Sequence, residues 1–330
     1  MCNSKKTSFI IMKEFENCKL CEWKCGVDRT KEMGVCNIKR PEVAYTCLSK
    51  PLKSYSINLV GCNFRCLFCD AYQISQSLNT KWYYRGYIEP KDLAKESANR
   101  IKSAGVERMT FTGAEASINL PYIEEVVKEI KRILPELKIG ISTNGFETEE
   151  SMERIVNICS YITFEIKAFK NETYLALTGA PVGPVLRNAE YLLKHREKIR
   201  NFRTVVIPKI NDGEIEDMAR FIASFDPSVP FHLIGFKPFF VLFDHPGPTS
   251  SELEELANRC RKYLDNVIWF GGYPDKVEFK EAGAAFVKKY LELVSIKRVE
   301  CASKGKKCES CELDKSCAGS YAILKKGIKS

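Results

Sequence analysis

Short β-branched runs alternate with amphipathic helical stretches over most of this chain, from Ser54 to Gly272. Six strand–helix units in succession favour a parallel sheet wound with right-handed crossovers. The predicted strands are Ser54–Gly61, Arg108–Gly113, Lys138–Thr143, Tyr161–Phe169, Phe202–Ile210, Pro230–Phe236 and Val267–Phe270. The predicted helices are Pro90–Ala104, Leu120–Leu134, Thr148–Cys159, Val185–Lys198, Glu214–Phe225 and Ser251–Leu264. This repetition predicts an α/β fold, a partial (β/α)6 barrel of parallel strands.

A chain of 330 residues is long enough for one large domain with appendages. We expect an N-terminal cysteine-rich metal-binding extension at 1–53, the barrel at 54–272, and a C-terminal helix with a further cysteine-rich extension at 273–330. No apolar run approaches the roughly 18–20 residues that span a bilayer. The apolar run Ser8–Met12 is too short for the core of a signal peptide. We therefore expect a cytoplasmic protein without a membrane partner.

The chain contains 15 cysteines and only three histidines. Disulfides are rare in the cytosol, so metal binding is the economical explanation, and ligands that are nearly all thiolate favour Fe–S clusters or zinc. Eleven of the cysteines form three groups: Cys18, Cys21, Cys25 and Cys36; Cys62, Cys66 and Cys69; and Cys301, Cys308, Cys311 and Cys317. Of the remaining four, Cys47, Cys159 and Cys260 are expected to be small buried apolar residues.

The central group has the spacing Cys62-x3-Cys66-x2-Cys69, on a loop that follows the first predicted strand. Three thiolates at this spacing reach three irons of a cubane cluster and leave the fourth iron without a protein ligand. An open coordination position distinguishes a reactive metal centre from a closed structural one. The alternative is a zinc site that a distant residue such as Cys47 completes.

A CxxxCxxC motif after the first strand of a partial β/α barrel resembles the signature of the radical S-adenosylmethionine (SAM) superfamily. The resemblance implies a [4Fe–4S] cluster on Cys62, Cys66 and Cys69 as the catalytic centre, with SAM chelating the open iron. One electron from the cluster, supplied by a reductant such as ferredoxin or flavodoxin, would cleave SAM to methionine and a 5′-deoxyadenosyl radical. That radical would abstract hydrogen from a substrate, while the protein positions and shields the reactants.

The same resemblance assigns SAM contacts near the cysteine loop. Phe68 matches the aromatic position that contacts adenine; packing within the loop is the alternative. The sequence TGAEAS at residues 112–117 occupies the place of the GGEP motif, whose backbone receives the SAM amino group. Gly113 and Glu115 keep that motif. Ala114 replaces its second glycine, a change that is tolerated unless the backbone φ is positive there.

Further SAM contacts are expected at the ends of later strands. Asn144 would contact the ribose, or it would only form an Asn-Gly turn. Glu165 and Lys167 point the same way along a strand. The carboxylate would bind the ribose hydroxyls and the lysine the SAM carboxylate; a buried ion pair is the alternative.

Resemblance to activating enzymes of the pyruvate formate-lyase type covers roughly residues 18–272. His232 looks like the histidine that contacts the adenosyl group in that branch, although a lone histidine on an apolar strand can also be a core residue. Thr204 and Val206 line the preceding strand end and have weaker claims to a SAM contact.

The two outer cysteine groups are each large enough for a closed site. Cys18, Cys21, Cys25 and Cys36 predict one Fe or Zn ion, or an Fe–S cluster, with a structural or electron-relay role. The C-terminal group resembles the auxiliary-cluster segments of SPASM and twitch extensions, which implies a second [4Fe–4S] cluster. Tyr321 stands where a further cysteine usually follows, so Cys301 is a candidate fourth ligand. A zinc knuckle that grips nucleic acid is the alternative.

Three functions are compatible with these features. The first is a radical SAM enzyme of activating-enzyme or maturase type, acting on a protein or peptide. The second is a radical SAM enzyme that modifies RNA, suggested by the net charge of +9 and the lysine-rich tail. The third is a non-catalytic Fe–S or zinc protein or electron carrier. The open site and the large barrel count against the third, since carriers have closed sites.

Overall fold

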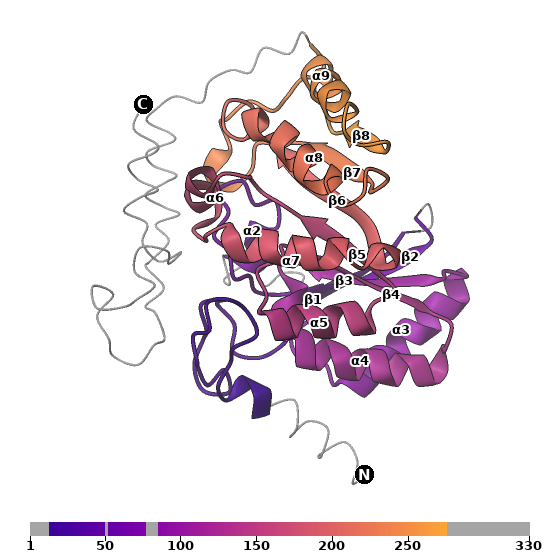
Figure 1. The fold of residues 1–330 in the computed structure, drawn as a ribbon. Helices are drawn as coiled ribbons and strands as arrows, with labels where there is room; N and C mark the ends of the chain where they lie inside the picture. The colour runs from indigo at the N-terminus through magenta and orange to yellow at the C-terminus, as the bar shows by residue number, and fades with distance from the viewer. Residues whose placement is uncertain (1–12, 50–51, 77–84, 276–330) are drawn as a thin grey trace. The chain divides into compact units, whose positions relative to one another are not determined.

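The computed structural model describes residues 13–49, 52–76 and 85–275 (Figure 1). Eight strands form one sheet in which the strand order follows the chain. Pairs β2–β3, β3–β4, β6–β7 and β7–β8 are parallel, and β1 pairs with β2 in the antiparallel sense. The strands are β1 Val43–Ser49, β2 Ser54–Leu59, β3 Arg108–Gly113, β4 Lys138–Thr143, β5 Tyr161–Glu165, β6 Ile199–Val206, β7 Phe231–Gly235 and β8 Val267–Phe270. This mostly parallel α/β sheet is the arrangement of a partial β/α barrel and confirms the expected fold class.

Helices connect the parallel strands. The α-helices are α2 Tyr72–Ser75, α3 Pro90–Ala104, α4 Leu120–Ile133, α5 Glu149–Ile158, α6 Asn171–Thr178, α7 Gly183–Leu193, α8 Ile215–Ala223 and α9 Ser250–Cys260. The 3-10 helices are η1 Ala116–Asn119, η2 Arg196–Lys198, η3 Asp212–Glu214 and η4 Phe240–Leu242. No helix in the described ranges is both long enough and apolar enough to cross a membrane.

The chain divides into two compact units and passes from the first to the second within β5. In the described ranges the first unit holds residues up to 63 and from 71 to 163, with α3 and α4 side by side (Figure 1). Helix α3 begins at Pro90 and ends at Ala104, where Gly105, with φ +63°, caps its C-terminus. Helix α4 buries one face through Ile123, Val126 and Ile130, so helical periodicity produces the core here.

The second unit holds residues 64–70 and 164–275. Its core includes the rings of Phe164 and Phe202, whose centroids are 5.2 Å apart. Helix α9 begins with a capping box, in which the Thr249 side chain accepts from the Glu252 backbone and Glu252 accepts from the Thr249 backbone. This cap fixes the start of the last described helix one residue before the predicted Ser251.

Some elements differ from the prediction. Strand β1 and helices α2 and α6 were not predicted, and the helix expected at Val185–Lys198 divides into α7 and η2. Three predicted elements end four residues earlier: β5 stops at Glu165 rather than Phe169, β6 at Val206 rather than Ile210, and α9 at Cys260 rather than Leu264. After β5 the chain turns, because the Phe169 and Lys170 amides donate to Glu214 Oε2 at 2.7 and 2.8 Å instead of to a neighbouring strand. The division into segments 1–53, 54–272 and 273–330 stays a prediction, although β1 shows that the first segment contributes to the sheet.

Candidate active site

The loop after β2 carries the three motif cysteines. Cys62 and Cys66 are buried and Cys69 is half-buried. In the first unit, the Gly61 amide donates to the Ile74 carbonyl at 2.8 Å. In the second unit, the Arg65 amide donates to the Thr178 carbonyl at 2.8 Å. Backbone hydrogen bonds therefore hold this short loop near both of its ends.

The chemistry of these thiols fits a metal cluster. Burial raises the pKa of Cys66 to about 12, although the positive charge of Lys167 opposes this rise. A thiol with that pKa is neutral at pH 7 and becomes a thiolate when a metal cation compensates its charge. Three such sulfur donors on one short loop suit iron, which binds soft thiolate ligands in Fe–S clusters.

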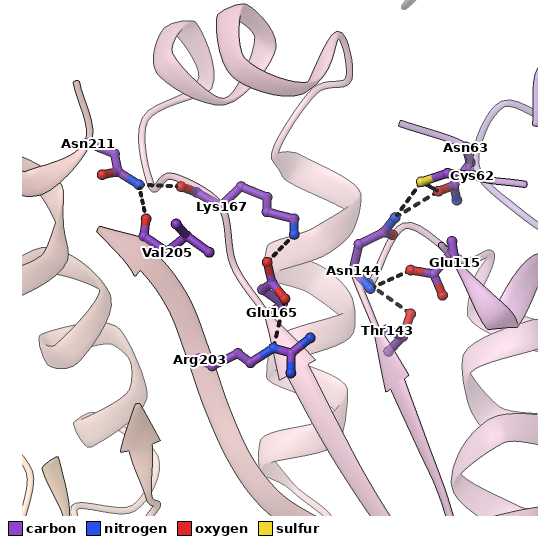
Figure 2. A network of polar contacts seen from close by, with 11 residues as sticks. Cys62, Asn63, Glu115, Thr143, Asn144, Glu165, Lys167, Arg203, Val205 and Asn211 are labelled. Carbon is purple, nitrogen blue, oxygen red and sulfur yellow. Dashed lines mark hydrogen bonds and ion pairs between the residues drawn. The ribbon is translucent and has the colours of Figure 1, made fainter. Parts of the chain in front are cut away.

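Asn144 connects the end of β4 to the cysteine loop within the first unit (Figure 2). Its side-chain Nδ2 donates to Asn63 Oδ1 at 2.7 Å and lies 4.0 Å from Cys62 Sγ. Its Oδ1 accepts the Phe146 amide at 3.0 Å, which is an Asx turn. Asn144 thus forms the Asn-Gly turn that was the alternative to a ribose contact, and its side chain also lies near Cys62. The ribose contact stays a prediction.

Glu115 is buried, and each of its carboxylate oxygens accepts a backbone amide. Oε1 accepts from Ser117 N at 3.1 Å. Oε2 accepts from Asn144 N at 2.8 Å (Figure 2). Burial, followed by the nearby Glu147 carboxylate, raises the pKa of Glu115 to about 7. Both donors are backbone amides of the protein, so the Glu115 carboxylate fixes the 115–117 loop against the end of β4.

The predicted glycine motif depends on one glycine. Gly113 has φ +110°, which favours glycine. Ala114 is not among the described residues with positive φ, and its amide donates to the Leu59 carbonyl at 3.1 Å. Alanine is therefore compatible with the backbone at the position of the second glycine, as the sequence argument required.

In the second unit, Glu165 lies between two cations (Figure 2). Its Oε1 pairs with Lys167 Nζ and its Oε2 accepts from Arg203 Nε at 2.7 Å. Burial raises the pKa of this carboxyl, but Lys167 and Arg203 outweigh burial and hold it at about 2. Lys167 Nζ also lies 5.6 Å from the centroid of the buried Phe68 ring. The structure thus contains the ion pair that was the alternative reading, and the SAM contacts of these residues stay predictions.

Removing the single anion of this group should destabilise the protein more than removing one cation. Glu165→Gln leaves two cations facing each other in a site where the Glu165 side chain is 10 % exposed and the Lys167 side chain 14 %. We expect a loss of about 3 kcal/mol in the free energy of unfolding. Lys167→Met leaves the Glu165–Arg203 pair intact and should cost about 1 kcal/mol. Urea unfolding of both variants measures this, and an equal or reversed order would contradict the arrangement.

The remaining predicted SAM contacts lie on β6 and β7. His232 is half-buried beside Arg203 in the strand register, and burial, followed by Arg200 and Arg203, lowers its pKa. Thr204 and Val206 are buried on the opposite face of β6 from Arg203, because strand side chains alternate. Thr204 Oγ1 has no hydrogen-bond partner in the part of the chain that the structure describes. The roles of these three residues stay predictions.

The cysteines outside the loop divide by burial. Cys18 and Cys36 are buried, and Cys21 and Cys25 are half-buried. Cys159 and Cys260 are buried, as expected. Cys47 is exposed on β1, so its prediction as a buried residue was wrong; that strand was not recognised. Tyr321 lies outside the described residues. The four predicted C-terminal ligands also lie outside them: Cys301, Cys308, Cys311 and Cys317.

Sequence reasoning missed Arg203 and Arg29, each of which touches a predicted site residue. Arg203 binds Glu165, and Arg29 Nη1 lies 3.9 Å from Cys18 Sγ. A charged residue inside the apolar stretch 202–207 was a signal for Arg203. Arg29 carried no such signal, because the two oxygen atoms to which it donates, on Ile118 and Asn119, lie about 90 residues away in the chain.

Comparison with known proteins identifies the class. Residues 59–222 match the family model described as the radical SAM superfamily. This region begins at the last residue of β2 and contains β3 to β6, the cysteine loop and the residues around Gly113, Asn144 and Glu165. The chain belongs to the radical SAM superfamily, whose members use SAM and a [4Fe–4S] cluster.

Similar proteins indicate which members of the superfamily this chain resembles. A protein of Methanocaldococcus jannaschii named "putative glycyl-radical enzyme activating enzyme" is 26 % identical over 64 % of this chain and 86 % of its own length. An uncharacterized protein of the same organism is 24 % identical over 77 % of each chain. The crystal structure of Streptococcus suis SuiB shares the fold, with a TM-score of 0.50 and 16 % identity over 68 % of this chain and 52 % of that one. The chain is thus a radical SAM protein similar to activating enzymes.

Proposed function

We propose that this protein is a radical SAM enzyme that abstracts hydrogen from a protein or peptide substrate. The observation that carries the proposal is the loop Cys62-x3-Cys66-x2-Cys69, with two buried thiols, at the end of the first parallel strand of a matched radical SAM domain. The similarity to a named activating enzyme supports a polypeptide substrate, since such enzymes act on another protein.

Different residues of the candidate site would hold the cluster and SAM. Cys62, Cys66 and Cys69 would hold the cluster, and the backbone around Gly113 and Ala114 would receive the amino group of SAM. Asn144 and Glu115 keep this backbone in place through their hydrogen bonds. Lys167, beside Phe68, would bind the SAM carboxylate, and Glu165 orients Lys167. When bound, the cluster and SAM supply reductive cleavage of the sulfonium and the radical that removes hydrogen.

The test is product formation. Protein that is reconstituted with iron and sulfide under anaerobic conditions, then given SAM and dithionite, should release 5′-deoxyadenosine and methionine in equal amounts. A fully loaded protein that releases neither product would contradict the proposal.

The substrate class can be tested in the same assay. A heated extract of the source cells should stimulate 5′-deoxyadenosine release, and the stimulation should disappear after protease treatment but survive ribonuclease. Loss after ribonuclease alone would favour the RNA-modifying alternative and would overturn the polypeptide substrate.

A further inference from the structure

The N-terminal cysteines lie on a closed turn within the first unit. The Cys18 amide donates to the Val27 carbonyl and the Gly26 amide to the Cys18 carbonyl, both at 3.0 Å. Lys24 and Gly26 have positive φ, at 43° and 62°, which lets the chain reverse between residues 18 and 27. Three thiols therefore occupy one short turn. A Cβ added at Gly34 would lie 3.3 Å from Cys36 Sγ and 3.8 Å from Arg29 Cδ, so Cys36 lies beside the arginine that contacts Cys18.

Arg29 gives this turn an unusual electrostatic environment. Its side chain is 1 % exposed, and its guanidinium contacts Cys18 Sγ, the Phe15 ring, the Ile118 carbonyl and Asn119 Oδ1. None of these groups is anionic when Cys18 is a thiol, and Arg29 Nε has no partner in the described ranges. A buried charge needs a counter-charge. Four thiolates around a divalent ion carry a net charge of about −2, which would supply it.

The ligand spacing favours one ion. Cys18-x2-Cys21 and Cys21-x3-Cys25 have the two-to-four-residue separations of closed tetrahedral thiolate sites. No group of three or more Cys, His, Asp or Glu side chains in the described part of the chain already has the arrangement of a metal site. The same is true of Cys62, Cys66 and Cys69, whose spacing is the family's cluster motif.

We propose that Cys18, Cys21, Cys25 and Cys36 bind one divalent metal ion through four thiolates, with Arg29 as the counter-charge. The filled site then holds the loop of the catalytic cysteines in place. This proposal does not rest on the proposed function, since metal binding and loop order are measured without SAM or substrate.

The coupling follows from contacts between the extension and the cysteine loop. The Cys62 amide donates to the Cys36 carbonyl at 3.2 Å. A backbone hydrogen bond therefore joins the last cysteine of the N-terminal group to the first cysteine of the catalytic loop. Trp23 Nε1 donates to the Asn63 carbonyl at 2.7 Å. A Cβ added at Gly61 would lie 2.8 Å from Ile38 Cγ2, which shows how closely the extension packs here.

The extension also contacts the other two loops of the candidate site in this unit. Arg29 Nη1 donates to the Ile118 carbonyl at 2.6 Å, directly after the Glu115 loop. The Glu22 amide donates to the Phe146 carbonyl at 3.0 Å, two residues after Asn144. An ion that fixes residues 18–36 therefore restrains all three loops together.

Metal binding is tested on the full chain with the seven cysteines at 62, 66, 69, 301, 308, 311 and 317 changed to alanine. This variant should bind about one Co²⁺ per chain, with the sulfur-to-metal charge-transfer absorption of a tetrahedral four-thiolate site and without acid-labile sulfide. Cys21→Ser in this background should lose that spectrum, whereas Cys47→Ser, at the exposed strand position, should keep it. Zinc and iron contents of the wild-type protein as purified identify the native ion.

The counter-charge has its own test. Arg29→Met should lower the Co²⁺ affinity by about 10- to 100-fold, and Arg29→Lys should lower it less, because it keeps the positive charge. Equal affinity in the Met variant would overturn the role of Arg29. Binding of no ion, or of iron with stoichiometric sulfide, would overturn the single-ion site.

Loop order is measured by hydrogen exchange on otherwise wild-type protein. In Cys21→Ser the amides of Cys62 and Asn63 should exchange about 10-fold faster than in Cys47→Ser. The amides of β7 and α9, in the other unit, serve as the internal control and should be unchanged. Unchanged exchange at residues 62–63 in a variant that has lost the ion would overturn the coupling.

Discussion

Cys66→Ala should reduce the release of 5′-deoxyadenosine from reconstituted protein by about 10³-fold or more. Each of the three motif cysteines supplies one cluster ligand, and the loop offers no replacement: the Cys66 position is buried and its neighbours on the loop are Arg65 and Leu67. A cluster with only two protein ligands is not retained. The loss should therefore appear both in product and in bound iron and sulfide.

The matched control is Cys47→Ala. Cys47 is exposed on β1 and belongs to none of the three cysteine groups, so this variant should keep its iron, sulfide and SAM cleavage. Cys260→Ala, at a buried position of α9, tests whether a cavity elsewhere in the fold has the same effect. Full SAM cleavage by Cys66→Ala, or an equal loss in Cys47→Ala, would contradict the assignment of the loop.

Gly113→Ala should cause the largest loss of stability among single methyl additions near the site. Gly113 has φ +110°, and an added Cβ would lie 2.7 Å from both Leu59 N and Leu59 O. These are backbone atoms of the paired strand β2, which cannot rotate away as a side chain can. Backbone strain and overpacking together should cost about 3 kcal/mol or more.

The neighbouring position provides the control. Ala114→Gly removes a methyl group at ordinary φ and should change the free energy of unfolding by about 1 kcal/mol at most. The midpoints of urea unfolding of the two variants, compared with wild type, measure the difference. A Gly113→Ala protein as stable as wild type would show that the close approach of β2 and β3 does not constrain this motif.

The departure of the glycine motif from its family pattern has a structural explanation in these two residues. Gly113 alone carries the unusual φ, while Ala114 bonds its amide to Leu59 in a conformation open to any residue. The alanine that replaces the second glycine therefore still forms the backbone hydrogen bond from residue 114 to Leu59.

Short-range patterns determined much of the fold. The bounds of α3, β3, β4 and β8 were predicted to the residue. Each depends on periodicity, a proline at the start or a glycine at the end, which act within a few residues. The cysteine spacing also acts locally, which is why the sequence alone identified the loop and its family.

Only the tertiary structure decided which groups meet. Strand β1 exists through its pairing with β2, and the charge of Glu165 is set by Arg203, 38 residues further along the chain. Arg29 reaches residues about 90 positions away, and the Cys36 carbonyl meets the Cys62 amide. Such contacts have no periodic signature, because the sequence between two distant partners does not show that the fold brings them together. The sequence by itself determined the ligands and the strand–helix repeat, and folding decided which charges and hydrogen bonds hold them.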